Sequence, residues 1–530
     1  MQPSNATQAR SIAEELFGHE SLLPGQEESI VALLEGHDVL LISPTGSGKS
    51  LTYQVAGMLL PGVTVVVSPL LALQHDQVQR LAEAGPAVLA GRLSSAESDA
   101  AKQEVLSRAR SGELQFVFLS PEQLANDALR GDLLDLAPGL VAVDEAHCVS
   151  SWGHDFRPDY QRLGELIAQL GAPRVIAMTA TASPPVREDI VASLALRDPR
   201  VVATGVARRN LALDVRRATG SEEQHRVVVE LAAEKGRLPG IVYCRTRRAS
   251  EEYAAELHAR GLRVAAYHAG LAQKRRAATQ DRFMAGELDL VVATSAFGLG
   301  IDKPDIRSVV HAQVPESPDT YYQEVGRAGR DGAPAEATLV YRPEDLALGR
   351  FFSPGVPRRE AVAAVLTALS HSPDVDPAAI REATGLGPRV AGRIRNLVAD
   401  VEAAGAHPVE VEDVVARAEA LRQLERSRVE MMRGYAETDR CRMEFLVAYF
   451  GDRLRDLCGH CDNCRAELAE PPPEEDALPW ALQSRVAHET FGSGLVTDHV
   501  EDEITVLFDE AGYRTLSRKL VEEKELLEPL

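Results

Sequence analysis

Residues 38–50, DVLLISPTGSGKS, decide the fold of this chain, because a short apolar strand runs directly into a glycine-rich loop and then into a helix. Glycines let backbone N–H groups turn inward around phosphate oxygens, and the N-terminus of the following helix favours negative charge. The order strand, loop, helix is the context in which such a loop binds phosphates. We therefore expect an α/β domain with a nucleotide site at the end of this strand.

The loop supplies most of the predicted nucleotide site. Lys49 is expected to reach the β- and γ-phosphates, and the Ser50 hydroxyl is expected to ligate Mg²⁺. The backbone that surrounds the phosphates is expected to come from Thr45, Gly46, Ser47, Gly48 and Lys49. The loop departs from the general pattern G-x-x-x-x-G-K-S/T, because Ser43 stands in place of the first glycine.

Apolar strands alternate with helical stretches through the first 350 residues. Their hydrophobicity is continuous rather than alternating, as in parallel strands that are covered on both faces. The predicted strands are residues 38–42, 64–68, 116–120, 140–144, 174–179, 240–244, 263–268, 288–294, 308–312 and 337–341. Two successive parallel α/β domains follow, residues 1–205 and 206–350, and a ligand held by both would bind between them.

The strand at 140–144 ends in a second motif for phosphate chemistry. Asp144 can hold the Mg²⁺ shell, and Glu145 can orient and deprotonate an attacking water. In the second domain, Arg327 and Arg330 are three residues apart, a spacing that puts both on one face of a helix. An arginine from that domain would stabilise charge on the departing phosphate, so that ATP closes the two domains and hydrolysis reopens them.

Four of the six cysteines lie within 24 residues: Cys441, Cys458, Cys461 and Cys464. In a reducing compartment this grouping predicts a closed tetrahedral Zn²⁺ site rather than disulfides. We expect His460, between two of the ligands, to face solvent. Cys148 and Cys244 lie beside apolar strands and are predicted to be buried thiols.

Composition restricts the class of protein. A chain of 530 residues predicts about three to five domains. It has no run of about eighteen apolar residues, and its charged N-terminal stretch does not resemble a signal peptide, so we expect a cytoplasmic protein with no membrane partner. The net charge of −22 does not decide whether nucleic acid binds, because phosphate contacts depend on local positive charge.

The pattern becomes helical after the second domain. Residues 358–408 predict a helix-turn-helix or winged-helix-like module, in which Val390, Ile394, Leu397, Val398 and Val401 share one helix face. A generic three-helix packing module fits this pattern nearly as well. Residues 410–466 lead into the cysteine cluster, residues 467–480 form a Pro/Glu linker, and residues 481–530 form a small terminal module.

These motifs resemble those of the RecQ family of superfamily 2 DNA helicases. Residues 144–160, DEAHCVSSWGHDFRPDY, are similar to helicase motif II of that family together with its aromatic-rich loop. The remaining motifs follow in the family's order at residues 17–26, 66–78, 178–182, 243–247, 267–271, 293–311 and 323–332. The cysteine cluster is similar to the RecQ zinc-binding domain.

The resemblance implies two tandem RecA-like motor domains. It further implies ATP-dependent 3′ to 5′ translocation on single-stranded DNA, with duplex unwinding in DNA repair and recombination, and ATP, Mg²⁺ and Zn²⁺ as cofactors. By position, Gln26 would read adenine and Asp302 would help to close the nucleotide site. The residues implied to couple hydrolysis to domain movement are His147, Thr179 and Thr181.

The aromatic-rich loop is implied to contact DNA through Trp152, Phe156 and Arg157. Stacking on bases tolerates any sequence, which suits a translocase, while core packing is the alternative for the two aromatic residues. Leu22 and Leu23 stand where the family has an aromatic residue and an arginine, so we expect weaker selectivity for adenine.

Only 66 residues follow Cys464, too few for the winged helix and the further helical module of many RecQ proteins. We hypothesise that residues 358–408 hold duplex DNA instead, through Arg389, Arg393 and Arg395. Residues 485–516 resemble the SH3/Tudor-like barrel of UvrD/PcrA-type helicases, which implies a module that binds RNA polymerase or another protein. A barrel that only packs on the zinc domain is the alternative.

Two other functions stay open from the sequence alone. The tetrad Asp-Glu-Ala-His at 144–147 also occurs in RNA helicases. The helix-turn-helix and the terminal module also fit a transcription-linked factor that remodels complexes with little unwinding. We favour a monomeric enzyme that acts on single-stranded and forked DNA in the nucleoid.

Overall fold

The computed structural model describes residues 4–69, 71–83, 85, 88–94, 97–150, 160–171, 173–298, 301–347, 349, 355–371, 377–403, 405–471, 480–500 and 502–530. Its contacts divide the chain into two units. The first comprises residues 1–313, 319–340 and 439–470, and the second comprises residues 314–318, 341–438 and 471–530.

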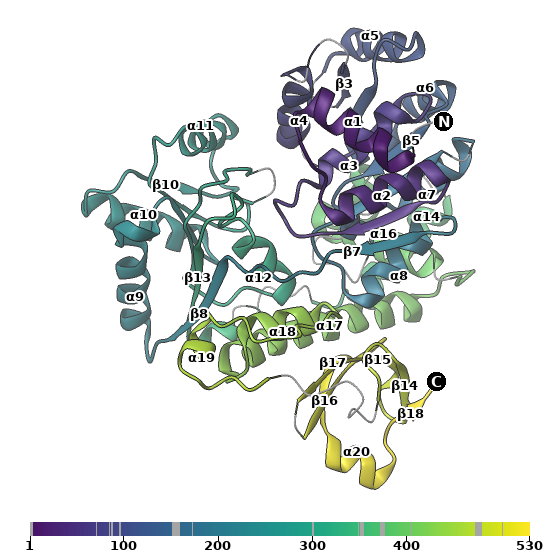
Figure 1. Ribbon diagram of the computed structural model, residues 1–530. Coiled ribbons are helices and arrows are strands. Elements are labelled where there is room, and N and C mark those ends of the chain that lie inside the picture. Colours follow the sequence, from purple (N-terminus) through teal and green to yellow (C-terminus); the bar gives the residue numbers. More distant parts are fainter. Residues whose placement is uncertain are drawn as a thin grey trace. The chain divides into compact units, whose positions relative to one another are not determined.

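Seven strands form the first sheet, in the order β3-β4-β2-β5-β6-β1-β7 with parallel neighbours. Figure 1 labels β3, β5 and β7 of this sheet. They are β1 (Val39–Ile42), β2 (Thr64–Val67), β3 (Ala90–Leu93), β4 (Phe116–Leu119), β5 (Leu140–Val143), β6 (Arg174–Thr179) and β7 (Arg200–Ala203). All five apolar runs predicted for residues 1–205 are strands. The sequence prediction missed the two edge strands, β3 and β7, which are only partly buried.

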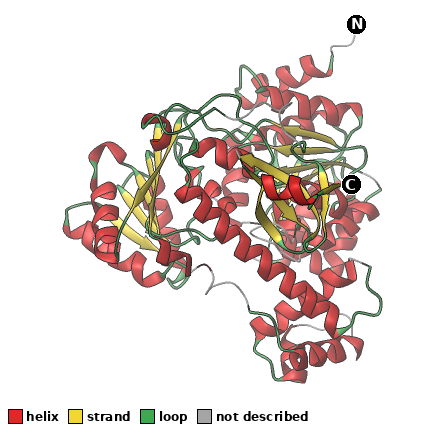
Figure 2. Cartoon of the chain, turned by 90° about the horizontal axis from the view of Figure 1, so that it is seen from below, coloured by secondary structure: helices red, strands yellow, loops and turns green. Residues whose placement is uncertain are grey.

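The apolar runs are continuous because this sheet separates two cores. Along β1, Val39 and Leu41 belong to one buried cluster, whereas Leu40 and Ile42 belong to the other. Helices (red) therefore lie on both sides of the strands (yellow) in Figure 2. They are α1 (Asn5–Phe17), α2 (Pro24–Glu35), α3 (Lys49–Leu59), α4 (Leu71–Glu83), α5 (Asp99–Arg110), α6 (Asp127–Leu136), α7 (Gln161–Gln169) and α8 (Pro184–Ser193).

The second sheet has six strands in the order β10-β11-β9-β12-β13-β8. They are β8 (Leu211–Arg217), β9 (Gly240–Tyr243), β10 (Val264–Tyr267), β11 (Leu290–Ala293), β12 (Ser308–His311) and β13 (Ala335–Tyr341). The pairs from β10 through β13 are parallel, as predicted. The helices of this domain are α9 (Ser221–Ala233), α10 (Arg247–Ala259), α11 (Gln273–Met284) and α12 (Pro318–Val325). Two parallel α/β domains are thus confirmed.

The second unit contains a helical module. Its helices are α14 (Arg359–His371), α15 (Pro377–Thr384), α16 (Pro388–Ala403) and α17 (Val411–Glu437), and all four contribute to one core. The prediction for α16 holds at Ile394, Leu397, Val398 and Val401, which are buried. It is wrong at Val390, which is 46% exposed because it lies in the first turn of the helix, before the core begins.

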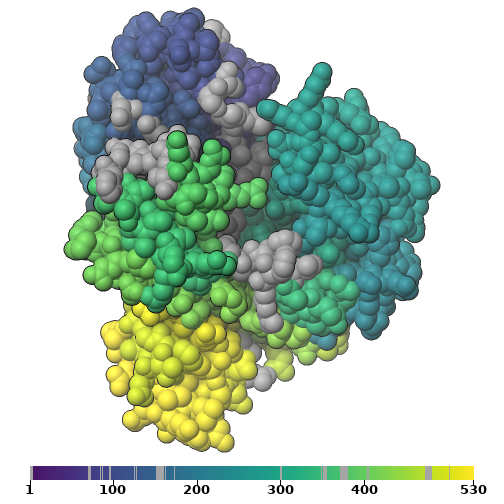
Figure 3. Space-filling model, turned by 180° about the vertical axis from the view of Figure 1, so that it is seen from behind, coloured from purple at the N-terminus to yellow at the C-terminus, as the bar shows by residue number. Residues whose placement is uncertain are grey.

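The terminal module is an antiparallel sheet in the order β17-β16-β15-β14-β18 (yellow in Figure 3). Its elements are β14 (Arg485–His488), β15 (Gly492–Val500), β16 (Glu503–Phe508), β17 (Gly512–Ser517), α20 (Arg518–Lys524) and β18 (Glu528–Pro529). Strand β17 packs on α17 at Gly512, where an added Cβ would lie 2.4 Å from Ser427 Oγ. The same hydroxyl oxygen accepts a hydrogen bond from the Tyr513 N–H, at 3.0 Å. The terminal module therefore packs on α17, which lies within the residues 410–466 predicted as the zinc domain.

Among the described residues, none of the helices combines the length and apolar character needed to cross a membrane.

The contact between β17 and α17 can be tested with a pair of glycines. Gly512 and Gly492 both have a positive φ, 69° and 76°, but only Gly512 has a neighbour within 4 Å of an added Cβ. Gly492→Ala is expected to cost about 1 kcal/mol, the strain of a left-handed backbone. Gly512→Ala is expected to cost clearly more, because Ser427 must also move. Urea unfolding measures both, and equal losses would show that the contact contributes nothing.

Candidate active site and metal centre

The phosphate loop connects β1 to α3 and requires its two glycines. Gly46 and Gly48 have φ of 81° and 70°, and added Cβ atoms would lie 2.9 Å from Arg330 Cγ and 2.8 Å from Gln26 Nε2. Lys49 spans the loop, with Nζ donating to the carbonyls of Ser43 at 2.8 Å and Pro44 at 3.1 Å. The loop therefore holds the Lys49 ammonium group where phosphates are predicted to bind.

Ser43, the departure from the general loop pattern, stabilises the loop through its hydroxyl. Its Oγ donates to Ser47 Oγ at 2.8 Å and accepts from Thr204 Oγ1 at 2.8 Å. A glycine could make neither bond. The substitution thus ties the loop to the chain that follows β7.

Gln26 lies beneath this loop with its amide fully used. Its Nε2 donates to the carbonyls of Ser47 at 3.0 Å and Gly48 at 2.9 Å, while Oε1 accepts from the Leu23 N–H at 3.0 Å. The structure thus shows Gln26 holding the loop, and its contact with adenine stays a prediction. Leu23 is 53% exposed beside it, and Leu22 packs on the core.

The two carboxylates follow β5 directly. Burial and the neighbouring charge of Glu145 raise the pKa of Asp144 to about 7, despite the opposing effect of Lys49. Burial likewise lowers the pKa of Lys49 to about 8, although Glu145 and Asp144 partly offset it. Glu145 Oε2 is buried and has no hydrogen-bond partner in the part of the chain that the structure describes. Carboxylates held in this way fit a divalent cation, whose charge would favour their ionised form.

The three residues implied to couple hydrolysis to movement form one chain of contacts. His147 Nδ1 lies 3.4 Å from Glu145 Oε2 and 3.0 Å from Thr179 Oγ1. Thr179 Oγ1 donates its only hydrogen to the Thr181 carbonyl, at 2.9 Å, so the His147 bond must be donated by Nδ1–H. The structure therefore connects the second carboxylate to the motif at 178–182.

Arg327 and Arg330 do not lie on a helix, and that prediction is wrong. Helix α12 ends at Val325, and residues 326–330 form turns in which Gly329 has φ of 61°. The left-handed backbone of Gly329 does not continue a right-handed helix. Gly326 packs closely against the phosphate loop, where an added Cβ would lie 2.5 Å from Thr45 Oγ1. We name residues 326–330 the arginine turn.

The arginine turn is held at the phosphate loop by its neighbours. Thr45 Oγ1 donates to the Gly326 carbonyl at 2.8 Å, and the Arg330 side chain packs against Gly46. Arg330 Nη1 also donates to Asp302 Oδ1 at 2.9 Å. The Nε atoms of Arg327 and Arg330 are buried and have no hydrogen-bond partner among the described residues. The turn thus presents guanidinium donors at the loop.

Asp302 also contacts Arg80 of α4, which sequence reasoning missed. Arg80 Nη1 lies 2.6 Å from Asp302 Oδ2. Burial alone would raise the pKa of Asp302, but Arg330 and Arg80 together hold it below its ordinary value. No local sequence signal marks Arg80, because its partner is more than 200 residues away.

The four cysteines of the predicted metal site converge. Their Sγ atoms all lie within 4.8 Å of one another, and those of Cys458 and Cys464 are 3.8 Å apart. A disulfide requires about 2.05 Å, whereas two thiolates on a tetrahedral Zn²⁺ with Zn–S near 2.3 Å lie about 3.8 Å apart. The N–H groups of Cys461 and Cys464 point at the sulfurs of Cys458 and Cys461, both at 3.4 Å. These residues form a zinc-binding site.

The cysteine-bearing segment covers β8, the edge strand of the second sheet. Asp462 Oδ2 accepts from the Val215 N–H at 2.9 Å, and Arg465 Nη2 donates to the Asp214 carboxylate at 2.8 Å. His460, which was expected to face solvent, is partly exposed, and both of its ring nitrogens lie near backbone carbonyls. Its Nδ1 lies 2.5 Å from the Cys458 carbonyl and its Nε2 lies 3.1 Å from the Leu211 carbonyl.

Comparison with known proteins places these sites in a family. Three family models match: DEAD/DEAH box helicase at residues 23–190, helicase conserved C-terminal domain at 223–332, and RecQ zinc-binding at 393–465. ATP-dependent DNA helicase RecQ of Bacillus subtilis is 34% identical over 86% of this chain. Probable ATP-dependent DNA helicase RecS of the same organism is 40% identical, over 64% of this chain and 68% of that protein. The chain belongs to the RecQ family.

This RecQ-family chain aligns with 66% of the length of the B. subtilis RecQ protein, just under two thirds. Among solved structures, Mycobacterium smegmatis helicase Lhr bound to ssDNA and AMP-PNP matches with a TM-score of 0.53 and 21% identity, over 78% of this chain and 62% of that one. At this identity the likeness concerns the fold alone. The RecQ zinc-binding match begins at residue 393, within α16, so it includes part of the predicted 358–408 module.

The predicted DNA contacts are only partly accessible. Trp152, Phe156 and Arg157 lie outside the described residues. Arg389 is exposed on α16, whereas Arg393 is partly buried and donates to the Gly355 carbonyl, and burial lowers its pKa. Arg389 is therefore the better placed of the two for a phosphate.

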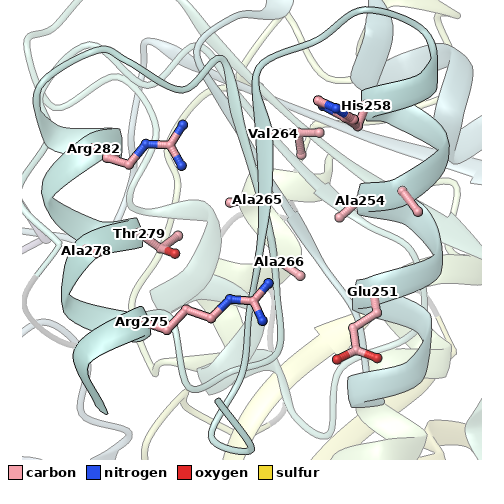
Figure 4. Close-up of a pocket in the computed structure, with 11 residues that line it drawn as sticks. Glu251, Ala254, His258, Val264, Ala265, Ala266, Arg275, Ala278, Thr279 and Arg282 are labelled. Atoms are coloured by element: carbon pink, nitrogen blue, oxygen red, sulfur yellow. The ribbon is translucent and has the colours of Figure 1, made fainter. Parts of the chain in front are cut away.

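A separate pocket of about 550 Å³ lies on the second domain (Figure 4). Its floor is the edge strand β10, and its walls are α10 and α11. Arg275 and Arg282 project from α11, opposite Glu251 and His258 of α10. The pocket contains none of the site residues predicted from the sequence.

Asp144→Asn should stabilise the folded chain at high pH and not at low pH. The pKa of Asp144 is raised to about 7, so the ionised side chain destabilises the folded chain at higher pH. In EDTA the variant should have a higher Tm than the parent at pH 8, and the gain should shrink as the pH falls toward 4. Asp135→Asn, at an exposed position of α6, is the control. A gain that is the same at pH 5 and pH 8 would contradict the assignment.

Cys461→Ser should abolish stoichiometric zinc binding, because three thiolates leave the tetrahedral shell open. We expect residues 439–470 to become sensitive to protease, since their fold depends on the metal. Metal analysis and limited proteolysis are the measurements. Cys244→Ala, at a buried cysteine outside the cluster, should keep its zinc. Full zinc content in Cys461→Ser would exclude the four-thiolate site.

Proposed function

We propose that this RecQ-family protein is an ATP-dependent DNA helicase that translocates 3′ to 5′ on single-stranded DNA and unwinds duplex in repair and recombination. One observation carries the proposal: the arginine turn of the second domain packs on the phosphate loop of the first, with Arg330 against Gly46. Hydrolysis that needs groups from two domains changes how those domains contact each other. Such a change is what a motor can convert into movement along a strand.

The chemistry follows from the groups at the loop. Lys49 exchanges its bonds to the Ser43 and Pro44 carbonyls for the β- and γ-phosphates of ATP. Glu145 takes a proton from the water that attacks the γ-phosphorus, and the bond to the β-phosphate oxygen breaks to give ADP and phosphate. Ser50 and Asp144 would hold Mg²⁺, which would supply charge neutralisation for the phosphates. Arg327 and Arg330 stabilise the charge on the transferred group.

DNA and nucleotide communicate through the segment that follows the carboxylates. The predicted DNA contacts Trp152, Phe156 and Arg157 come within thirteen residues of Asp144, on the same stretch of chain. The contact chain from Glu145 through His147 to Thr179 and Thr181 supports the coupling role proposed for these residues. Asp302 releases Arg330 to the phosphates as the nucleotide site closes.

We also propose which DNA structure and which protein this chain binds. The helical module contacts the duplex of forked DNA through Arg389, Arg393 and Arg395, and charge reversal at the exposed Arg389 should weaken fork binding first.

Residues 481–530 bind RNA polymerase or another protein. Pull-down of polymerase core by the full chain tests this, with Leu520→Asp as a variant at an exposed position. The protein acts as a monomer in the cytoplasm, at the nucleoid.

Unwinding of tailed duplexes tests the main proposal. The protein should displace the strand from a 3′-tailed duplex and not from a 5′-tailed one, and single-stranded DNA should stimulate its ATPase more than RNA does. Lys49→Ala should lower kcat by about two orders of magnitude or more, since it removes the cation that holds the phosphates. Glu113→Gln, on the surface of the same domain, is the control.

Three outcomes separate the alternatives. Stimulation by RNA alone would favour an RNA helicase. Stimulation by DNA without strand displacement would favour a transcription-linked remodeller. An ATPase rate that no nucleic acid changes would exclude a motor of any of these kinds.

A further inference from the structure

Arg208 lies in the segment that crosses from β7 of the first sheet to β8 of the second. The sequence gives it no motif. Its Nη2 donates to the carbonyls of Gly329 at 2.7 Å and Ala328 at 3.0 Å. Its Nη1 donates to the carbonyls of Gly326 at 3.4 Å and Thr45 at 3.3 Å. One guanidinium thus contacts three residues of the arginine turn and one residue of the phosphate loop.

The arginine turn needs these bonds because no helix satisfies its carbonyls. Helix α12 ends at Val325, and the carbonyls at the end of a helix require donors from elsewhere. Asn210 contributes from the same crossing segment, with Nδ2 donating to the carbonyls of Gly329 at 2.8 Å and Ala333 at 2.9 Å. Arg208 Nε in turn donates to Asn210 Oδ1, at 3.3 Å. The crossing segment thus fixes the backbone on which Arg327 and Arg330 are carried.

The bond to Thr45 adds a link to the nucleotide. The same Nη1 group lies between the carbonyls of Thr45 and Gly326, and Thr45 Oγ1 donates to the Gly326 carbonyl. Any movement of Thr45 when phosphates enter the loop is therefore passed to Gly326, next to Arg327. The contacts join the two halves of the proposed active site through backbone atoms rather than through the catalytic side chains.

We propose that Arg208 is a positioning residue that couples occupancy of the phosphate loop to the placement of the arginine turn. The proposal rests on the proposed hydrolysis of ATP and adds the residue that regulates it. A lysine could not replace Arg208 fully, because its three donors radiate from one atom, whereas the guanidinium presents five donors in a plane that spans four carbonyls.

Three variants of the full chain test the coupling. Arg208→Met keeps the length of the side chain and removes its donors, and Arg208→Lys keeps the charge. Arg209→Ala is the matched control, since Arg209 is the exposed neighbour and makes no hydrogen bond to the turn among the described residues. Steady-state ATPase with and without single-stranded DNA, binding of a fluorescent non-hydrolysable ATP analogue, and Tm are measured for each.

Arg208→Met should lower the DNA-stimulated kcat by about ten- to a hundred-fold, the range expected when a catalytic group is misplaced by about 1 Å. Affinity for the ATP analogue should stay within about two-fold of the parent, because the phosphate loop keeps its own contacts. Arg208→Lys should recover part of kcat, and Arg209→Ala should match the parent. Unchanged kcat in Arg208→Met, or a loss of kcat in proportion to a loss of analogue binding and Tm, would overturn the coupling role.

Hydrogen exchange separates this proposal from the proposed function. The ATP analogue should slow amide exchange at residues 326–333 in the parent and in Arg209→Ala, and should leave it unchanged in Arg208→Met. This holds even if DNA does not stimulate the ATPase, an outcome that would remove the motor function and keep the coupling. Equal protection in the parent and Arg208→Met would exclude Arg208 as the link, whatever the ATPase shows.

Discussion

The approach of Arg330 to Gly46 is the contact on which the active site depends. The loop residue can have no side chain here, because an added Cβ would lie 2.9 Å from Arg330 Cγ and φ is 81°. The same glycine therefore serves two purposes: it lets the loop turn around phosphates, and it admits an arginine from the second domain. A phosphate loop alone can bind a nucleotide. A phosphate loop that is met by an arginine from a second domain can also make hydrolysis depend on how the two domains are placed.

Charge at this contact is unbalanced until substrate arrives. Lys49, Arg327 and Arg330 bring three cationic groups, and Asp144 and Glu145 bring two carboxylates, into a partly buried space. The lowered pKa of Lys49 and the raised pKa of Asp144 both reflect the cost of holding charge there. Asp302 pairs with Arg330 and Arg80 and so offsets part of the excess positive charge. A metal with phosphates would satisfy both sets of groups at once, which is the expected behaviour of a site built for phosphoryl transfer.

The parts of the molecule that could be predicted from sequence are those whose signal is local. Apolar runs identify strands that are buried on both faces, and the spacing of Cys458, Cys461 and Cys464 identifies a metal knuckle within seven residues. The edge strands β3 and β7 lack such runs, because only part of each is buried. The turn at 326–330 was predicted as a helix from the spacing of its two arginines. Its packing against Thr45 could not be predicted, because that residue lies about 280 positions earlier in the sequence. His460, Arg80 and Arg208 escaped prediction for the same reason, since each acts through partners distant in sequence.

The zinc segment and the active site are connected through a single strand. The crossing segment that carries Arg208 and Asn210 continues directly into β8, and the carbonyl of Leu211, its first residue, contacts His460. Further along the strand, Asp462 and Arg465 hold Val215 and Asp214. An edge strand has unpaired backbone groups and is easily displaced, so this cover fixes the position of β8. Asn210 and Arg208 immediately precede that strand. A bound metal would therefore also stabilise the backbone that carries these two side chains to the arginine turn. A zinc site with no open coordination position can in this way support catalysis without taking part in it.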